Sequence, residues 1–235
     1  MIYNILEFPE SENREFPEVP DSFLAHLPVW KWQEIERMKN TGSRQKRLLA
    51  WKLLEETLQK AGLADNLADL GLTAGSHGKP RCREGLHLFV NISHCPAACA
   101  CAAGSSPVGI DIERRFPFRQ NLFDRICSKK EQELAIEFAG SSSNALNLCW
   151  SIKEAVLKME GSGISYGMER ADLSPLLHEA LLQKNMRSDV MWNVDITGQI
   201  GGIGNMKLHL EQNERYTLAV CGCHEPICNQ SDMKS

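Results

Sequence analysis

The 235-residue sequence has no uninterrupted run of about 18 apolar residues, which a membrane-spanning helix would need. Its first residues, MIYNILEFPE, also lack the basic region and apolar core that mark a secreted protein. We therefore expect a cytoplasmic protein that does not act in a membrane.

Two familiar short motifs are missing as well. No G-x-x-x-x-G-K-[ST] phosphate loop occurs, so the glycines of TGQIGGIGN are expected to form a hairpin turn. The nine cysteines include no C-x-x-C pair, and their apolar surroundings favour free thiols in a reducing compartment. A zinc site is the less favoured alternative. Its candidate ligands would be Cys95, Cys99, Cys101, Cys221, Cys223 and Cys228.

A strong net charge is absent too. The formal charge of −4 argues against nucleic-acid binding as the main task. With 43% hydrophobic and 24% charged residues, the chain can form one large domain or two modest lobes. Charge is nevertheless uneven, because basic residues gather around the single acid Asp124. They are Arg114, Arg115, Arg119, Arg125, Lys129 and Lys130.

Hydrophobic periodicity predicts both helices and strands. A helix is expected over 43–61, ending at Gly62, and cations lie at its start, where the helix dipole prefers anions. These cations either face solvent or bind a ligand. They are Arg44, Lys46 and Arg47. The S-K-K-E sequence at 128–131 predicts a capping box that opens another helix, and a further helix follows over 144–160.

Alternating segments predict strands. They include residues 1–8, LHLFVNISH, CPAACACAAG, VGIDIE and three carboxyl-terminal segments, whereas 65–75 reads as loop. In VGIDIE, alternation places Asp111 and Glu113 on one face, about 6–7 Å apart. Neighbouring carboxylates repel unless a cation neutralises them, and oxygen ligands without paired histidines suit Mg²⁺. Gly109 on that face is expected to leave room for a large group.

The segment WSIKEAVLKMEG supplies a third acid. Helical spacing aligns Leu146, Trp150, Glu154 and Lys158 in one stripe, and Gly161 is expected to end the helix. One interpretation is a surface ion pair between Glu154 and Lys158, worth about 0.3 kcal/mol. The other is that Glu154 joins the two acids of VGIDIE in a three-carboxylate site.

Three sequence motifs, taken together, are typical of a known family. They are GKP with NISH, VGIDIE, and WSIKEAVLKMEGSGIS, which together fall within residues 78–165. This combination resembles the 4′-phosphopantetheinyl transferases of the two-lobed Sfp type. The flanking thirds match only in pattern. Two departures from the family pattern are Cys95 after His94, where small residues such as Ser or Gly are familiar, and Ile126-Cys127, where the family often has two aromatics. The second bears on carrier preference more than on chemistry.

The resemblance implies a reaction. Such enzymes move the phosphopantetheine arm of coenzyme A to a serine of an acyl or peptidyl carrier protein, with Mg²⁺, and release 3′,5′-ADP. It implies that Asp111, Glu113 and Glu154 surround the metal. Glu154, directly or through water, would take the serine proton, and Lys158 would face the leaving phosphate. Lys153 would serve either the structure or phosphate binding.

The resemblance also implies a coenzyme A site. Ser93 and His94 would touch its phosphates. Lys79, together with Arg47 and Lys31 from the amino-terminal part, would bind the 3′-phosphate.

An α+β fold follows from the same resemblance, with two similar lobes related by a pseudo-two-fold duplication. Each lobe would be a small antiparallel sheet packed with helices, and the active site would lie in the cleft between them. The similarity of ACACAAGSSP to LAVCGCHEP, half a chain apart, favours this duplication. We expect lobes at 1–105 and 106–235, and a monomer.

The basic residues of 114–130 are expected to meet the acidic helix of a carrier protein. Solvated charge is the alternative, and charge reversal at Arg119 and Lys129 would distinguish the two interpretations.

Two other functions remain open: a Mg²⁺-dependent phosphohydrolase or nuclease using the same acids, and a silent carrier-binding module. The presence of all four residues Asp111, Glu113, Glu154 and Lys158 counts against the silent module.

Overall fold

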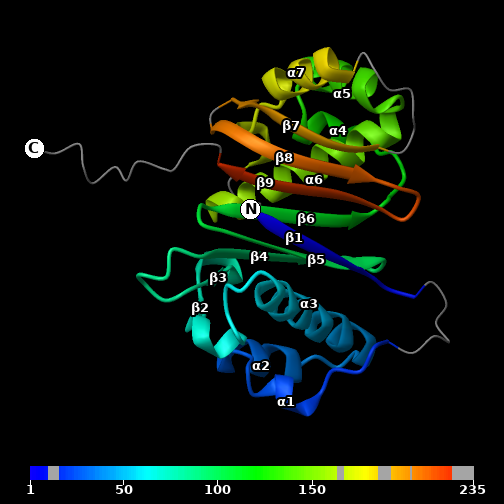
Figure 1. Ribbon diagram of the computed structural model, residues 1–235. Coiled ribbons are helices and arrows are strands. Elements are labelled where there is room, and N and C mark those ends of the chain that lie inside the picture. Colours follow the sequence, from blue (N-terminus) through cyan, green and yellow to red (C-terminus); the bar gives the residue numbers. More distant parts are fainter. Residues whose placement is uncertain (10–15, 163–166, 185–191, 202, 224–235) are drawn as a thin grey trace, which may run out of the picture.

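A computed structural model describes residues 1–9, 16–162, 167–184, 192–201 and 203–223. Helices and small antiparallel sheets form four layers, with the two larger sheets facing each other between two groups of helices (Figure 1). The α+β class expected from the sequence is confirmed. None of the described helices is both long and apolar enough to cross a membrane.

The amino-terminal half contains a three-stranded antiparallel sheet covered on one face by helices. Its strands in spatial order are β1 (Ile2–Glu7), β5 (Ala98–Gly104) and β4 (Phe89–His94). Its helices are α1 (Asp21–Leu24), α2 (Val29–Glu36) and α3 (Thr41–Lys60), with short η1 (Leu67–Leu70) and η2 (Ser76–Gly78) turns. A two-stranded ribbon pairs β2 (Thr73–Ala74) with β3 (Pro80–Arg81).

Helix α3 is the central helix of this half. The Asn40 side chain accepts a hydrogen bond of 2.7 Å from the backbone N–H of Ser43, so the helix begins with a satisfied N-cap. Its apolar stripe packs into the amino-terminal core, and Gly62, at φ 65°, follows its end. The helix predicted over 43–61 is confirmed, two residues longer at its start.

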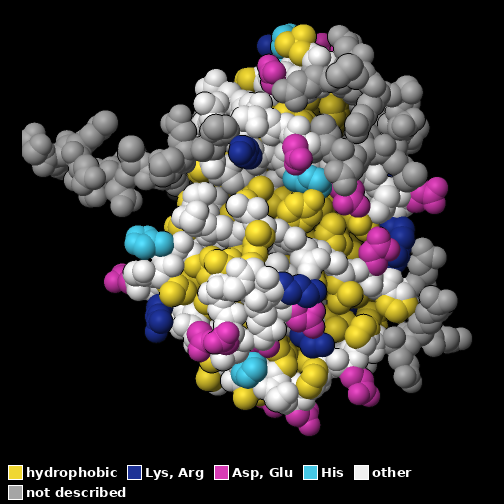
Figure 2. All heavy atoms as spheres, in the orientation of Figure 1, with side chains coloured by type: hydrophobic (Ala, Val, Ile, Leu, Met, Phe, Trp, Pro, Cys, Tyr) yellow, Lys and Arg dark blue, Asp and Glu magenta, His cyan; other side chains and the backbone are white. Residues whose placement is uncertain are grey.

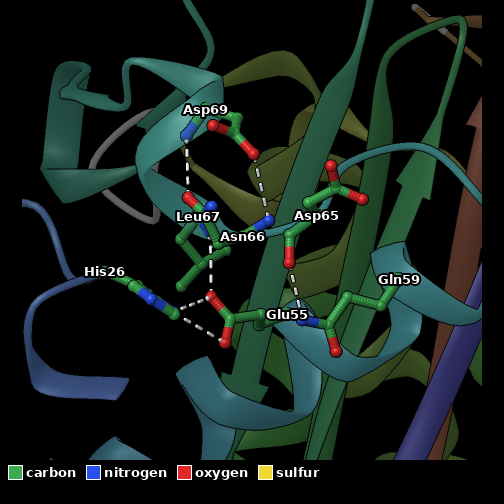
Figure 3. A network of polar contacts seen from close by, with 7 residues as sticks. All are labelled: His26, Glu55, Gln59, Asp65, Asn66, Leu67 and Asp69. Atoms are coloured by element: carbon green, nitrogen blue, oxygen red, sulfur yellow. Dashed lines mark hydrogen bonds and ion pairs between the residues drawn. The ribbon is translucent and has the colours of Figure 1, made fainter. Parts of the chain in front are cut away.

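The expected loop at 65–75 is wrong in part, because η1 forms within it. Asn66 and Asp69 make a capping box around this turn (Figure 3). Buried Glu55 of α3 accepts a 2.9 Å hydrogen bond from the backbone N–H of Leu67 and lies 2.9 Å from Nδ1 of His26. This carboxylate therefore joins three segments that are distant in sequence.

The carboxyl-terminal half contains a four-stranded antiparallel sheet. Its strands in spatial order are β6 (Val108–Arg114), β9 (Tyr216–Cys223), β8 (Gly204–Gln212) and β7 (Trp192–Ile200). The helices on its outer side are α4 (Gln120–Ile126), α5 (Lys129–Ala139), α6 (Ser142–Glu160), η4 (Met168–Arg170) and α7 (Ser174–Lys184).

The predicted capping box and the predicted helix stop are borne out here, whereas the helix expected over 144–160 begins two residues earlier, at Ser142. Ser128 and Glu131 form the capping box of α5, and Ser141 caps α6 by accepting from the N–H of Asn144. Gly161 ends α6 at φ 78°, a conformation that residues with a β-carbon rarely adopt. These local signals fix where the functional helix α6 begins and ends.

A separate apolar core lies between the two sheets. One face of β5 contributes only alanines, whereas the facing strands contribute larger side chains. The alanines are Ala98, Ala100 and Ala102, and the facing residues are Val108, Ile110, Ile112, Leu218 and Val220. Because a methyl group is the smallest apolar side chain, the two sheets can approach closely.

The cysteines contribute to these cores as free thiols. All eight that fall within the described residues are free, as predicted. Cys228 lies outside the described residues, as does Pro226, one of the residues on which the internal similarity was based. The surface shows no large patch of one charge on the face seen in Figure 2, where acidic and basic side chains of the described residues are scattered.

Candidate active site

Asp111 lies on the face of β6 opposite the core between the sheets, as alternation predicts. Gly109 shares that face, and a β-carbon there would lie 1.9 Å from the carbonyl oxygen of Ala155 in α6. The large neighbour for which Gly109 leaves room is therefore the protein's own helix α6. The close approach brings α6, with Glu154 and Lys158, directly against the Asp111 strand.

Lys158 and Ser93 both contact Asp111. The Lys158 ammonium donates to Oδ1 of Asp111 at 2.6 Å and to Oγ of Ser93 at 3.0 Å, and Ser93 donates to the same Oδ1 at 3.1 Å. Asp111 is 1% exposed. The suggested surface pair between Glu154 and Lys158 is thus replaced by an interaction with a buried acid on another strand.

Three carboxylates influence one another around this lysine. Burial, and then the charge of Asp111, raises the pKa of Glu154 to about 7, and the same causes raise the pKa of Glu113 to about 7. Burial alone would lower the pKa of Lys158, but Asp111, Glu154 and Glu113 together raise it. The lysine ammonium therefore supplies a positive charge that these acids require.

Within the described residues, no three His, Cys, Asp or Glu side chains, as they stand, are arranged to hold a metal ion. Two buried carboxylate oxygens nevertheless lack a hydrogen-bond partner, namely Oδ2 of Asp111 and Oε1 of Glu154. Unpaired buried oxygens are costly, and carboxylate oxygens are what Mg²⁺ prefers. The donor set therefore fits a hard cation, which would compete with the Lys158 ammonium for Asp111.

A second group of residues forms a cation-lined cavity of about 150 Å³. Its lining residues are Lys31, Arg47, Ala50, Trp51, Gly78, Pro80, Ile92 and His94. Partial burial, and then the charges of Arg47, Lys158, Lys31 and Lys46, lower the pKa of His94 to about 4. An anion in this cavity would meet several positive charges and a neutral imidazole that can donate a hydrogen bond.

Both cations of the cavity are paired with one acid that sequence reasoning missed. The Lys31 ammonium lies 2.6 Å from Oε2 of Glu34, and a guanidinium nitrogen of Arg47 contacts Oε1 of the same carboxylate. Nothing in the sequence around 28–39 distinguishes Glu34 from neighbouring Glu36. Only the three-dimensional approach of α2 and α3 reveals its position.

Ser93 and His94, predicted as a pair, lie on opposite faces of β4. Ser93 pairs with Ala100, whose side chain lies in the core between the sheets, and His94 pairs with Cys99, on the α3 side. Ser93 therefore contacts the acids, whereas His94 lines the cation cavity. The two predicted phosphate contacts belong to different groups of residues.

Lys79 is also placed apart from Lys31 and Arg47. Its ammonium donates to the carbonyl oxygen of Met159 at 2.8 Å, near the end of α6. Burial lowers its pKa to about 8. The structure therefore shows Lys79 bridging the two halves of the chain, where it also lines a cavity of about 140 Å³ with Lys158.

Comparison with known proteins finds relatives in one enzyme family. The family model described as the 4′-phosphopantetheinyl transferase superfamily matches residues 107–221. A 4′-phosphopantetheinyl transferase of Bacillus subtilis is 24% identical over 92% of this chain and 90% of its own length. The 4′-phosphopantetheinyl transferase Sfp of B. subtilis strain 168 is 26% identical over 69% of this chain and 71% of its own length. The 4′-phosphopantetheinyl transferase psf-1 of Bacillus pumilus is 37% identical over 39% of this chain and 40% of its own length.

Just under half of the chain thus matches the 4′-phosphopantetheinyl transferase superfamily, and most of its length is similar to a curated member. These matches indicate a transferase enzyme. The family model spans the three acids Asp111, Glu113 and Glu154 and the lysine Lys158 that lies among them. The residues that line the cation cavity of this transferase lie outside the matched range.

Lys153 of this transferase has a structural position. It is fully buried, and its ammonium lies 2.6 Å from Oε1 of Glu131 and donates to the carbonyl oxygen of Ile126 at 2.6 Å. The same Glu131 caps α5 and accepts from the N–H of Leu173. Of the two roles left open for Lys153, the structure favours support of the fold.

The basic segment of the transferase is only partly free of partners. Lys129 pairs with Asp124 at 2.9 Å, and Arg115 donates to the Asn144 side chain. Arg119 and Arg125 instead line a shallow depression of about 580 Å³ beside α4. Both arginines are exposed to solvent.

Proposed function

We propose that this transferase moves the 4′-phosphopantetheine arm of coenzyme A to a serine hydroxyl of an acyl or peptidyl carrier protein. The reaction would depend on Mg²⁺ and release 3′,5′-ADP. The observation that carries this proposal is the position of β4 between two groups of residues: Ser93 contacts the acids, and His94 lines the cation cavity. A substrate with several phosphates, such as coenzyme A, could place one phosphate group near the acids and another in the cation cavity.

Asp111, Glu113 and Glu154 would hold the Mg²⁺, which would offset charge on the phosphates of coenzyme A during transfer. The two unpaired oxygens, on Asp111 and Glu154, support this assignment. Ser93 and Lys158 already orient Asp111 through its other oxygen. The chain thus fixes one oxygen of Asp111 and leaves the second available.

Glu154 would take the proton of the carrier serine, directly or through a water molecule. The serine oxygen would form a bond to the phosphorus that bears pantetheine, while the pyrophosphate P–O bond breaks. Lys158 would neutralise the charge that develops on the departing 3′,5′-ADP phosphate.

The cation cavity would bind the 3′-phosphate of coenzyme A through Lys31, Arg47 and His94. We include Lys79 as a further phosphate ligand, which would exchange the Met159 carbonyl for a phosphate oxygen. Its depressed pKa, about 8, is consistent with a site that lacks a counter-charge.

We also propose the finer architecture and setting. Lobes at 1–105 and 106–235 would be related by duplication, with the active site in the cleft between them, and the enzyme would act as a cytoplasmic monomer. The separate sheet and helices of each half support the division. The carrier protein would dock its acidic helix on Arg119 and Arg125.

A mass spectrum of an apo-carrier incubated with this protein, coenzyme A and Mg²⁺ tests the function. We expect a gain of the phosphopantetheine mass that Glu154→Gln abolishes and that the matched variant Glu137→Gln, on the exposed side of α5, retains. Release of inorganic phosphate or cleaved nucleic acid without mass gain would indicate the hydrolase or nuclease instead. Carrier binding without mass gain would indicate the silent module.

A further inference from the structure

We propose that Glu34 is a built-in counter-ion of the 3′-phosphate site. The 3′-phosphate of coenzyme A would displace Glu34 from the cations, and the cost of this displacement would help to set the affinity for the nucleotide. The proposal rests on the proposed function, because it takes the cation cavity as the 3′-phosphate site. It adds an acid of this chain that opposes binding, and so a residue that determines affinity and specificity.

The contacts show one carboxylate shared by two cations. Oε2 of Glu34 lies 2.6 Å from the Lys31 ammonium, and Oε1 contacts the Arg47 guanidinium. Both oxygens of the acid are therefore engaged by the groups expected to bind phosphate. A phosphate that enters the cavity must share these donors with Glu34 or replace it.

Lys31 is held more firmly than the acid. Lys31 is 8% exposed, and its ammonium lies 4.9 Å from the centre of the Trp30 ring and 5.7 Å from that of Trp51. The Glu34 side chain is 43% exposed. Glu34 can therefore turn into solvent while Lys31 stays in place.

Arg47 adds an independent sign of a missing ligand. Its Nε is buried and has no hydrogen-bond partner, although its terminal nitrogen contacts Glu34. A buried guanidinium N–H without an acceptor is costly. A phosphate offers more acceptor oxygens than the single carboxylate, so it can satisfy Nε as well as the terminal nitrogen.

Charge decides the direction of the effect. Lys46 lies close enough to the cavity to influence His94, so several positive charges face a single carboxylate. A phosphate dianion carries about twice the charge of Glu34, so the cations would bind it in preference to the carboxylate. The carboxylate, if it stays nearby, would repel the phosphate. Removing the Glu34 charge should therefore strengthen phosphate binding. If Glu34 only positioned the cations, its removal would weaken binding instead.

Calorimetric titration with 3′,5′-ADP and with 5′-AMP, which lacks the 3′-phosphate, tests the proposal. We expect Glu34→Gln to bind 3′,5′-ADP about threefold more tightly and 5′-AMP unchanged, as expected for one like charge removed at a partly exposed site. The matched variant Glu36→Gln, on the same helix, should leave both affinities unchanged. Lys31→Met should weaken 3′,5′-ADP binding selectively.

Weaker binding of 3′,5′-ADP by Glu34→Gln, no change, or an equal change for both nucleotides would each overturn the proposal. Modification of the carrier by the unmutated protein is scored separately. If the carrier is modified and Glu34→Gln does not bind 3′,5′-ADP more tightly, the counter-ion role fails and the proposed function stands. If the unmutated protein neither modifies the carrier nor binds 3′,5′-ADP, both fail.

Discussion

The ammonium of Lys158, on helix α6, lies 2.6 Å from Oδ1 of Asp111, on strand β6. Asp111 is buried, so this contact supplies the positive charge that its carboxylate needs away from water. The contact also holds the helix that carries Glu154 against the strand that carries Glu113. Lys158 thereby links the two elements that contribute acids to the site.

Replacing Lys158 by Met should reduce the rate constant for carrier modification about 100-fold, because the cation facing the leaving phosphate is lost. Single-turnover measurements at saturating coenzyme A would report this rate. Lys60→Met, at an exposed position at the end of helix α3, is the matched control and should retain the full rate. A rate for Lys158→Met within twofold of the unmutated enzyme would contradict the assignment.

Replacing Lys153 by Met should reduce the free energy of unfolding by about 3–5 kcal/mol, because Glu131 would remain as an unpaired buried charge. Urea denaturation followed by circular dichroism would measure it. Lys52→Met breaks a surface pair with Glu56 and should cost under about 1 kcal/mol. Equal losses in the two variants would show that the buried pair does not stabilise the fold.

Stability should depend on pH through Glu113 and Glu154. Their pKa values of about 7 lie above the ordinary 4.5, so folding favours their protonated forms. That contribution is complete below about pH 4.5 and is lost as pH rises through 7, by on the order of 2 kcal/mol. Urea denaturation without Mg²⁺ at pH 5 and pH 8 measures it.

The double variant Glu113→Gln/Glu154→Gln isolates this effect, because other groups titrate in both proteins. Its free energy of unfolding should fall less between pH 5 and pH 8 than that of the unmutated enzyme. The same pH dependence in both proteins would refute the raised pKa values.

Charge reversal at Arg119 or Arg125 should raise the KM for the carrier protein about tenfold without changing the KM for coenzyme A. Lys129→Glu should have a smaller effect, because Asp124 already neutralises Lys129. Steady-state kinetics with several carriers would show this. Lys60→Glu, in the other half of the chain, is the control. An unchanged KM for the carrier in both arginine variants would contradict the proposed docking surface.

Local signals allowed much of the fold to be predicted from the sequence. The Ser128 capping box, the Gly161 helix end and the alternation around Asp111 each depend on a few neighbouring residues, and each is confirmed. The helical turn within 65–75 has a local signal too, the capping box of Asn66 and Asp69, which the loop expectation overlooks. Alternation also marks Gly109 as a point of close approach, but only the packing reveals that the approaching element is α6.

The candidate site was predictable only as a set of residue types. Helical spacing placed Glu154 and Lys158 on one stripe, but it could not show that Lys158 bonds Asp111. Strand alternation could have shown that Ser93 and His94 point to opposite faces, yet they were treated as a pair. The attachment of Lys79 to the Met159 carbonyl required the three-dimensional structure.

The alanine face of β5 has a consequence for the substrate. The proposed metal ligands belong to one half of the chain and the proposed 3′-phosphate ligands Lys31 and Arg47 to the other, with the methyl layer of Ala98, Ala100 and Ala102 between the two sheets. If the proposed function holds, the thickness of that layer would fix the span between the two ends of a bound nucleotide. The length of ligand that fits would then be set by side chains that never touch it.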